Sequence, residues 1–165
     1  MLHQLRFVIA GLVIILVNQA VTFAVSAAVP TALRPAGSTR YALVQNETQR
    51  DIGLPFTWES TGLSTSVTIP AGKTADVMVF FCGVANPGGN YINVRAKIGG
   101  QLLLPNFGGD GLDFATGSTA AESHCVNFHK TNVSEGTKTV KIDWLAGDTN
   151  PKLFSRSLMV ILNIH

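Results

Sequence analysis

Charged residues are scarce in this chain of 165 residues. Only 13% of its residues are Asp, Glu, Lys or Arg, about half of the usual proportion, and the formal net charge is +2. The basic residues stand singly, so no run of Lys or Arg forms a stripe that could follow a phosphate backbone. The sequence therefore predicts no nucleic-acid partner.

Helical periodicity is also missing after residue 40, since no segment of ten or more residues repeats apolar side chains at the helical spacing. Short β-branched or aromatic runs instead alternate with Gly, Pro, Asn and Asp at the spacing of a sandwich. We therefore expect an all-β fold, a single antiparallel β-sandwich (jelly roll) after an N-terminal hydrophobic export helix. The expected strands are 40–47, 54–59, 64–69, 75–84, 91–98, 101–104, 124–130, 137–145 and 157–164.

Two of these strands show clear alternation. In Thr137–Trp144 the residues Val140, Ile142 and Trp144 fall on one face, and Tyr91–Ile98 repeats the pattern before a Gly99–Gly100 hairpin turn. The last strand, residues 157–164, is almost continuously apolar, which predicts a central strand buried on both faces.

The first residues predict the compartment. An apolar run over residues 7–17 follows Arg6, and Val25-Ser26-Ala27 supplies small residues for cleavage after Ala27 or Ala28. The alternative is a retained membrane anchor over residues 7–29, which is long enough to span a bilayer. The expected organisation is a signal peptide or membrane anchor over 1–28, a linker over 29–39 and a β-sandwich/jelly-roll domain over 40–165. The protein is thus expected to be secreted or, alternatively, anchored to the membrane by its N-terminal segment.

Cysteine is limited to Cys82 and Cys125. In an exported domain an even number of cysteines favours a disulfide, and closing a loop of this length contributes about 4 kcal/mol in the chain-entropy model. Two separate buried thiols are the alternative.

Several segments together resemble a known superfamily. They are residues 67–74, 93–100, 128–133, 136–144 and 156–161. In their strand and turn patterns they are similar to the bacterial jelly-roll domains related to the C1q and tumour-necrosis-factor-like superfamily, from about Thr65 to the C-terminus. The resemblance implies a jelly roll that often assembles as a trimer and serves recognition or adhesion, and it transfers no binding residue. A stalk that would register a trimer is missing from the sequence.

Catalytic motifs are missing as well. Ser123 lies beside His124, but no Gly-x-Ser-x-Gly motif surrounds it, and adjacent strand residues point to opposite faces. Pairs of carboxylates for glycoside hydrolysis exist among Asp110, Asp113, Glu122 and Asp143, as they do by chance in any protein with ten acidic residues. The chain is expected to be no enzyme, with a small secreted hydrolase as the alternative.

One Gly-rich loop, residues 105–122, is long enough to be functional. It carries Asp110 and Asp113, oxygen ligands of the kind that calcium prefers, to which Asn106 and Glu122 could add; the alternative is a turn with solvated acids. No cofactor is required, and calcium is possible. The candidate ligand-binding residues are Asn106, Phe107, Asp110, Asp113 and Phe114, with Trp58 as a further ring for sugar stacking.

These features lead to two functional hypotheses. The first is a secreted, non-enzymatic recognition or adhesion module that binds a carbohydrate or surface polymer through the 105–122 loop. A trimer is one possible assembly of this module. The second is a structural subunit of an extracellular filament or surface layer, in which residues 29–39 pair with a neighbour's sheet edge.

Overall fold

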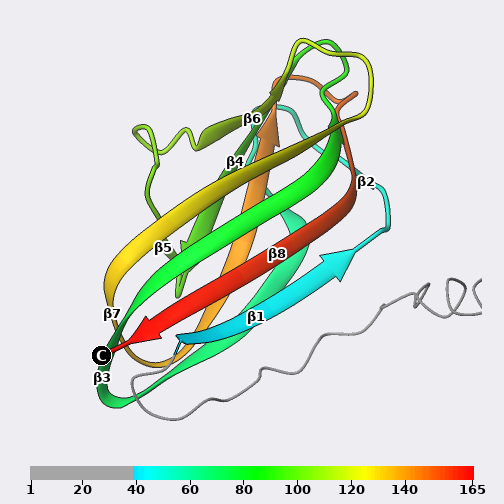
Figure 1. The fold of residues 1–165 in the computed structure, drawn as a ribbon. Coiled ribbons are helices and arrows are strands. Elements are labelled where there is room, and N and C mark those ends of the chain that lie inside the picture. Colours follow the sequence, from blue (N-terminus) through cyan, green and yellow to red (C-terminus); the bar gives the residue numbers. More distant parts are fainter. Residues whose placement is uncertain (1–38) are drawn as a thin grey trace, which may run out of the picture.

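The computed structural model describes residues 39–165 as eight strands (Figure 1). The expected export segment and all but the last residue of the expected linker lie outside the described residues, so the predictions made for them stay predictions. Among residues 39–165 no helix is long and apolar enough to cross a membrane. The strands are β1 (Thr39–Asn46), β2 (Arg50–Asp51), β3 (Glu59–Asn86), β4 (Tyr91–Ile98), β5 (Gln101–Leu102), β6 (Leu112–Thr116), β7 (Glu122–Ala146) and β8 (Lys152–Ile164).

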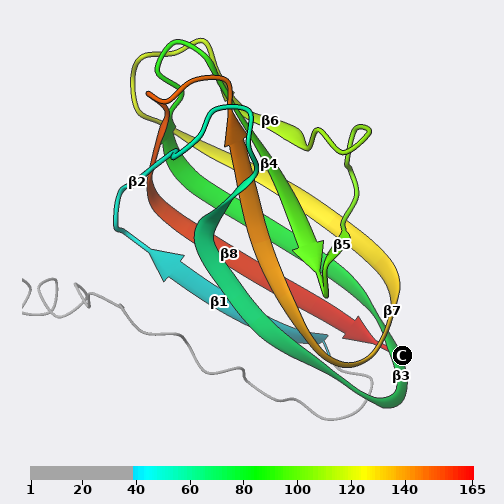
Figure 2. The ribbon, with the colours of Figure 1, turned by 180° about the vertical axis from the view of Figure 1, so that it is seen from behind.

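All strand pairs are antiparallel, and together they form one hydrogen-bonded sheet with the strand order β1-β8-β3-β7-β4-β5. In addition β2 pairs with β8, and β6 pairs with β4. The two longest strands, β3 and β7, pair with each other over two stretches. Glu59–Ile69 pairs with residues 136–144, and residues 74–85 pair with residues 122–134, with a register shift between Ile69 and Thr74. At this shift both strands bend together and pass from one layer of the molecule to the other (Figures 1 and 2).

The bend creates two packed layers. The front layer of Figure 1 contains β1, β8, the second half of β3 and the first half of β7, whereas the other layer contains the first half of β3, the second half of β7, β4 and β6. Because the halves of β3 and β7 lie in different layers, each half acts as a strand of its own. The eight main strands, numbered anew along the chain, are then β1, the two halves of β3, β4, β6, the two halves of β7 and β8. In this numbering the strand order is 1-8-3-6 in one layer and 2-7-4-5 in the other. This is the connectivity of an eight-stranded jelly roll. The expected fold class is confirmed.

The core lies between the two layers. The side chains of Val140, Ile142 and Trp144 are completely buried, as the alternation predicts, and so are the inward residues of Tyr91–Ile98. Phe81 and Phe128 face them from the other layer. Burial of each large apolar side chain contributes about 1.5–3 kcal/mol to the free energy of folding, and this burial holds the two layers together.

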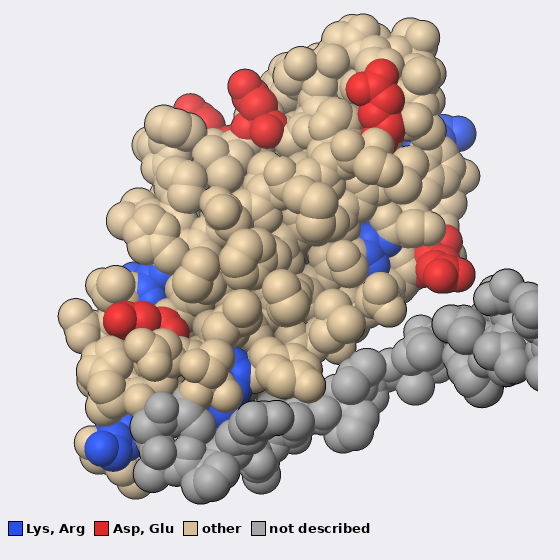
Figure 3. Space-filling view, in the orientation of Figure 1, with Lys and Arg blue, Asp and Glu red and all other residues tan. Residues whose placement is uncertain are grey.

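Two expectations about single strands are corrected. Strand β8 is central, between β1 and β3, but it is buried on one face only, because Met159 and Ile161 are half-buried on the outer surface. No described residues cover this outer face, which also exposes Tyr41 and Met78 and carries its charged groups mainly near its margins (Figure 3). Moreover, residues 54–58 form a turn rather than a strand.

The hairpin at Gly99–Gly100 is confirmed, with Ile98 paired to Gln101 and both glycines at positive φ. By contrast, the 105–122 segment is not free of strands, because it contains β6, which pairs with β4. Only five residues long and bounded by Gly111 and Gly117, β6 is too short for its alternation to stand out. Cys82 and Cys125 are directly opposite each other on β3 and β7 and form a disulfide, as expected.

Candidate binding site

A cleft of about 390 Å³ opens on the outer face of the layer that contains β4. Four segments of the chain bring its residues together: the turn before β3, strand β4, the loop before β6 and the end of β7. The residues that line it are Phe56, Trp58, Tyr91, Asn93, Asp110 and Leu145. Three of these six are aromatic, so the cleft offers ring faces together with an amide and a carboxylate.

Phe56 is the most exposed of these rings. Its side chain is 67% accessible to solvent, and its backbone has a φ of 56°, in the left-handed region that bulky residues rarely adopt. The Phe56 N–H donates to the carbonyl of Ala146 at 2.8 Å, which fixes this turn against the end of β7. A strained backbone that holds an apolar ring in solvent is a feature found at functional sites.

Trp58 is held by close packing. A β-carbon at Gly111 would come within 2.7 Å of Trp58 Cη2 and within 2.5 Å of the carbonyl oxygen of Val94, so only glycine permits this approach. On β4, Arg95 places its guanidinium carbon 4.0 Å from the centre of the indole ring, a cation–π contact. The indole is thereby fixed between a loop and a cationic side chain.

Tyr91 and Asn93 form the polar side of the cleft. A glycine at position 147 leaves room for the tyrosine ring, since a β-carbon there would come within 2.6 Å of Tyr91 Cε1. Asn93 donates from Nδ2 to the carbonyl of Asp110 at 3.2 Å, while its Oδ1 has no hydrogen-bond partner among residues 39–165. This amide oxygen is buried, and an unsatisfied buried acceptor next to a cleft is a polar group that a ligand or a water could satisfy only by entering between the side chains.

A group of charges adjoins the aromatic rings on the same face. Asp143, only 4% exposed, accepts from Lys97 Nζ at 3.0 Å, from Lys141 Nζ at 3.2 Å and from Arg95 Nε at 3.4 Å. Burial alone would raise the pKa of Asp143, but the hydrogen bonds and positive charges of the two lysines lower it below its ordinary value. Asp143 is therefore an ionised structural partner of three cations, and it is a poor candidate for a catalytic acid.

The sequence-predicted loop residues are dispersed by the fold. Asp110 lines the cleft, and Phe107 is exposed to 69% on the same loop. Asn106 is partly buried, and its Oδ1 lacks a partner in the described part of the chain. Asp113 is exposed on β6 in register with Asn93.

Phe114, expected in the binding loop, lies elsewhere. It is 4% exposed and packs on Phe81, with the ring centres 5.0 Å apart. As part of β6 its side chain points into the sandwich, so its ring cannot stack on a sugar from solvent. Residues 39–165 contain no group of three or more His, Cys, Asp or Glu side chains placed to hold a metal, so calcium at Asp110 and Asp113 stays a prediction.

Four of the six cleft residues were not predicted from the sequence as ligand-binding, namely Phe56, Tyr91, Asn93 and Leu145. Phe56 was assigned to a strand and Tyr91 only to the outward face of its strand. The available signal was the turn sequence Pro55-Phe56-Thr57-Trp58, which places two aromatic residues beside a proline. Nothing in the sequence indicates that Tyr91, which is 33 residues further along the chain than Trp58, joins them.

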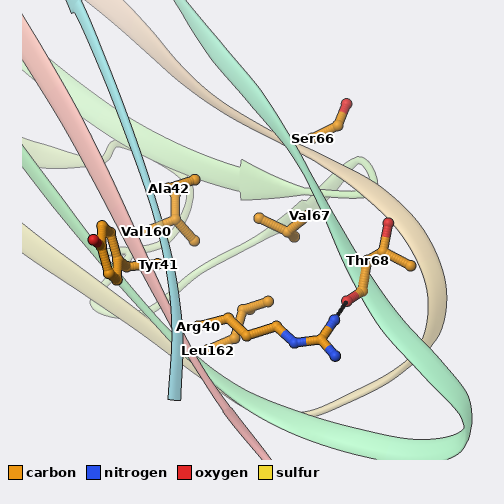
Figure 4. Close-up of a pocket in the computed structure, with 8 residues that line it drawn as sticks. All are labelled: Arg40, Tyr41, Ala42, Ser66, Val67, Thr68, Val160 and Leu162. Atoms are coloured by element: carbon orange, nitrogen blue, oxygen red, sulfur yellow. Dashed lines mark hydrogen bonds between the residues drawn. The ribbon is translucent and has the colours of Figure 1, made fainter. Parts of the chain in front are cut away.

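A second hollow, of about 150 Å³, separates β1 from the first half of β3 at the side of the sandwich (Figure 4). Its floor is apolar, formed by Ala42, Val67, Val160 and Leu162, and Arg40 reaches across it to donate to the carbonyl of Thr68 at 3.3 Å. Within the described residues, β1 and this part of β3 each have a strand partner on one side only. The hollow therefore lies between two open strand edges.

No family model matches the sequence, and no curated protein matches it either. Among solved structures, the CBM36-1 domain of a multidomain xylanase from the hindgut metagenome of Trinervitermes trinervoides is 17% identical over 73% of this chain and 95% of that chain, with a TM-score of 0.39. A carbohydrate-binding module CBM36 in complex with calcium and xylotriose is 14% identical over 71% of this chain and 97% of that one, with a TM-score of 0.36. A family 35 carbohydrate-binding module from Clostridium thermocellum is 13% identical over 70% of this chain and 90% of that one, with a TM-score of 0.34. Values this low assign neither a family nor a ligand to this chain, and none of these three structures is described as a C1q-like protein.

Proposed function

We propose that the protein is a non-enzymatic module that binds a carbohydrate in the cleft formed by Phe56, Trp58 and Tyr91. The observation that carries the proposal is that three aromatic rings, two from the turn before β3 and one from β4, line one open cleft, next to a buried amide oxygen without a partner among residues 39–165. The apolar faces of sugar rings pack on aromatic side chains, while their hydroxyls need donors and acceptors of the kind that Asn93 and Asp110 provide. In this proposal the binding surface shifts from the loop alone to the loop together with β4 and the turn before β3.

Binding without catalysis is favoured by the carboxylates of this face. Glycoside hydrolysis uses two carboxyl groups on opposite sides of the scissile bond, one of them with a raised pKa. Of the described residues, Asp110 is the one acidic residue that lines the cleft. Asp143, next to it on the same face, has a lowered pKa and is bound to three cations, so it does not supply the acid.

The test is binding to a panel of soluble plant, fungal and bacterial polysaccharides by affinity gel electrophoresis, with wild type and Trp58→Ala. Loss of the indole should weaken binding on the order of tenfold, because an aromatic stacking contact contributes about 0.5–1.5 kcal/mol beyond the area it buries. Tyr41→Ala is the matched control, since Tyr41 is an aromatic residue exposed to 50% on the opposite layer. Equal binding by wild type and Trp58→Ala, or a failure of wild type to bind any polymer, would contradict the proposal.

We also propose that the domain works outside the cytoplasm, on the basis of the apolar segment and small residues of the first 28 positions. A kinship with C1q-like domains and assembly as a trimer rest on the sequence resemblance alone. The filament subunit is kept as a second candidate because the hollow lies between the edges of β1 and β3, which have no second strand partner among the described residues and could pair with an added strand. In that assembly the strand is supplied by residues 29–39 of a neighbouring copy.

A further inference from the structure

We propose that the ligand of the cleft is an acidic polysaccharide whose uronate carboxylates bind to Arg95, Lys97 and Lys141. These three side chains are named the cation group below. The inference rests on the proposed function, and it adds the chemical class of the ligand.

The first argument is an imbalance of charge. Among residues 39–165 Asp143 is the one carboxylate bound by the cation group, so the cluster carries an excess of two positive charges. Lys97 and Lys141 are also directly opposite each other on β4 and β7. Like charges at opposite positions of a ladder are destabilising, and a single lysine would be enough to pair a buried aspartate. The second lysine and the arginine thus exceed what the fold requires.

The second argument is that donors of the cation group remain free. The Lys97 and Lys141 side chains are 20% and 42% exposed, and each ammonium has three donors, of which one reaches Asp143. Within the described residues Arg95 is hydrogen-bonded through Nε only, at 3.4 Å. Its two terminal nitrogens therefore keep the fork that binds a carboxylate with two parallel hydrogen bonds.

The third argument is the position of these donors relative to the rings. Arg95 stacks on Trp58, so one member of the cation group touches a wall of the cleft. Asn93, Arg95 and Lys97 alternate along β4 and share its outer face, each about 6.6 Å from the next. If a sugar ring packs on the aromatic residues, the cations therefore lie along the strand at a distance of about one further sugar unit.

Apart from Asp143, the acidic groups named on this face lie at the opposite end. Asp110 lines the cleft on the loop side, and Asp113 is in register with Asn93, whereas Lys97 is in register with Lys141 further along β4. The charge on this face therefore changes along β4, from acidic side chains near the loop to basic side chains beyond the aromatic rings. Such a face orients a chain in which a ring with free hydroxyls lies near Asp110 and a carboxylate lies on the cation group.

The experiment compares polygalacturonate with the same polymer after reduction of its carboxyl groups to neutral galactose units. Binding of the full chain is measured by isothermal titration for wild type, Trp58→Ala, the double variant Lys97→Gln/Lys141→Gln and the charge-preserving variant Lys97→Arg/Lys141→Arg. A double variant with the same charge change elsewhere, Lys73→Gln/Lys152→Gln, is the matched control, because both of these lysines are exposed and lie outside the cleft. Thermal unfolding of each variant shows that it is folded.

Wild type should bind polygalacturonate on the order of tenfold or more tightly than the reduced polymer, because each charge-assisted hydrogen bond is about twice as strong as a neutral one. Lys97→Gln/Lys141→Gln should remove this preference and keep the binding of the reduced polymer, whereas the arginine variant and the control keep the preference. Trp58→Ala should weaken binding to both polymers.

Three results would overturn the inference. Equal binding of both polymers by wild type leaves a carbohydrate module without a preference for acidic chains, so the proposed function stands and the inference fails. The same loss in Lys73→Gln/Lys152→Gln as in Lys97→Gln/Lys141→Gln shows attraction by overall charge and not by this site. Binding of neither polymer by a folded wild type overturns the assignment of polyuronate and counts against the proposed function, which the neutral polymers of the wider panel then decide.

Discussion

Asp143 shows how one residue links the fold to the candidate site. Its side chain lies on the outer face of β7, yet it is nearly as buried as the core, because Arg95, Lys97 and Lys141 converge on it. Burial alone would raise its pKa, but the two lysines lower it, so the folded state favours the ionised form. The resulting stability is fully present above the ordinary value of about 4 and is lost as the pH falls through the lower folded value.

The substitution Asp143→Asn should therefore destabilise the protein in a pH-dependent way. At pH 7 it leaves three cations without their counter-charge, and we expect the free energy of unfolding to fall by about 2 kcal/mol. Below the ordinary value of about 4, and further as the pH falls through the lowered pKa of Asp143, the wild-type protein loses this stabilisation and the difference between the two proteins should shrink. Urea unfolding of both at pH 7, 5 and 3 measures this, and a difference that is the same at all three values would show that shape rather than charge is involved.

At the level of single residues, the sequence predicted on which face of a strand a side chain lies better than it predicted which residues surround that side chain. The alternation placed Val140, Ile142 and Trp144 inside and Asp143 outside, and all four are so placed. The burial of Asp143 was not predictable, because its partners Arg95 and Lys97 lie on a strand more than forty residues away. The cleft could not be predicted for the same reason, because Phe56 and Tyr91 are distant in the sequence and are neighbours only where β4 pairs with β7.

Among the elements, β3 and β7 set the architecture, and their length was not foreseen. The segments Ser64–Ile69 and Ala75–Val84 were predicted as two strands, and they are two halves of β3 that bend at Pro70–Lys73. Local sequence indicates such a break correctly, since Pro and Gly interrupt ladders, but it does not reveal that hydrogen bonding resumes with the same partner strand beyond it. β6 was missed for the opposite reason, because a five-residue edge strand offers too little pattern.

The pairing of β3 with β7 also defines what the disulfide contributes. Cys82 and Cys125 are 43 residues apart and face each other in the ladder, with paired residues on both sides. The double variant Cys82→Ala/Cys125→Ala should keep the β-rich circular dichroism spectrum, because the ladder and the core do not depend on the bond. Its free energy of unfolding should fall by up to about 4 kcal/mol, the loop-closure term for this separation. Guanidinium unfolding measures the loss, and an unchanged midpoint would show that the unfolded chain is not restricted by the cross-link.

The molecule as a whole has two candidate binding surfaces of different character. The aromatic cleft and cation group lie on the outer face of one layer, and the apolar hollow between β1 and β3 lies at the side where the two layers meet. Open strand edges such as these pair readily with further chains unless they are blocked, and a lysine on the edge is a common block. Sugar binding and assembly are therefore separable by experiment, since they use different residues.

If the hollow accepts residues 29–39 of a neighbouring copy, a protein that begins at residue 28 should form oligomers, and one that begins at residue 39 should be monomeric. The shorter protein keeps every described strand, so its fold should be intact. Ser66→Lys, which places a charge at the exposed rim of the hollow, should reduce assembly of the longer protein, whereas Ser134→Lys, an exposed residue outside the hollow, should not. Light scattering after gel filtration gives the masses. Monomers in both proteins, or oligomers of equal mass in both, would remove the strand-exchange hypothesis and leave the cleft as the remaining candidate surface of the described residues.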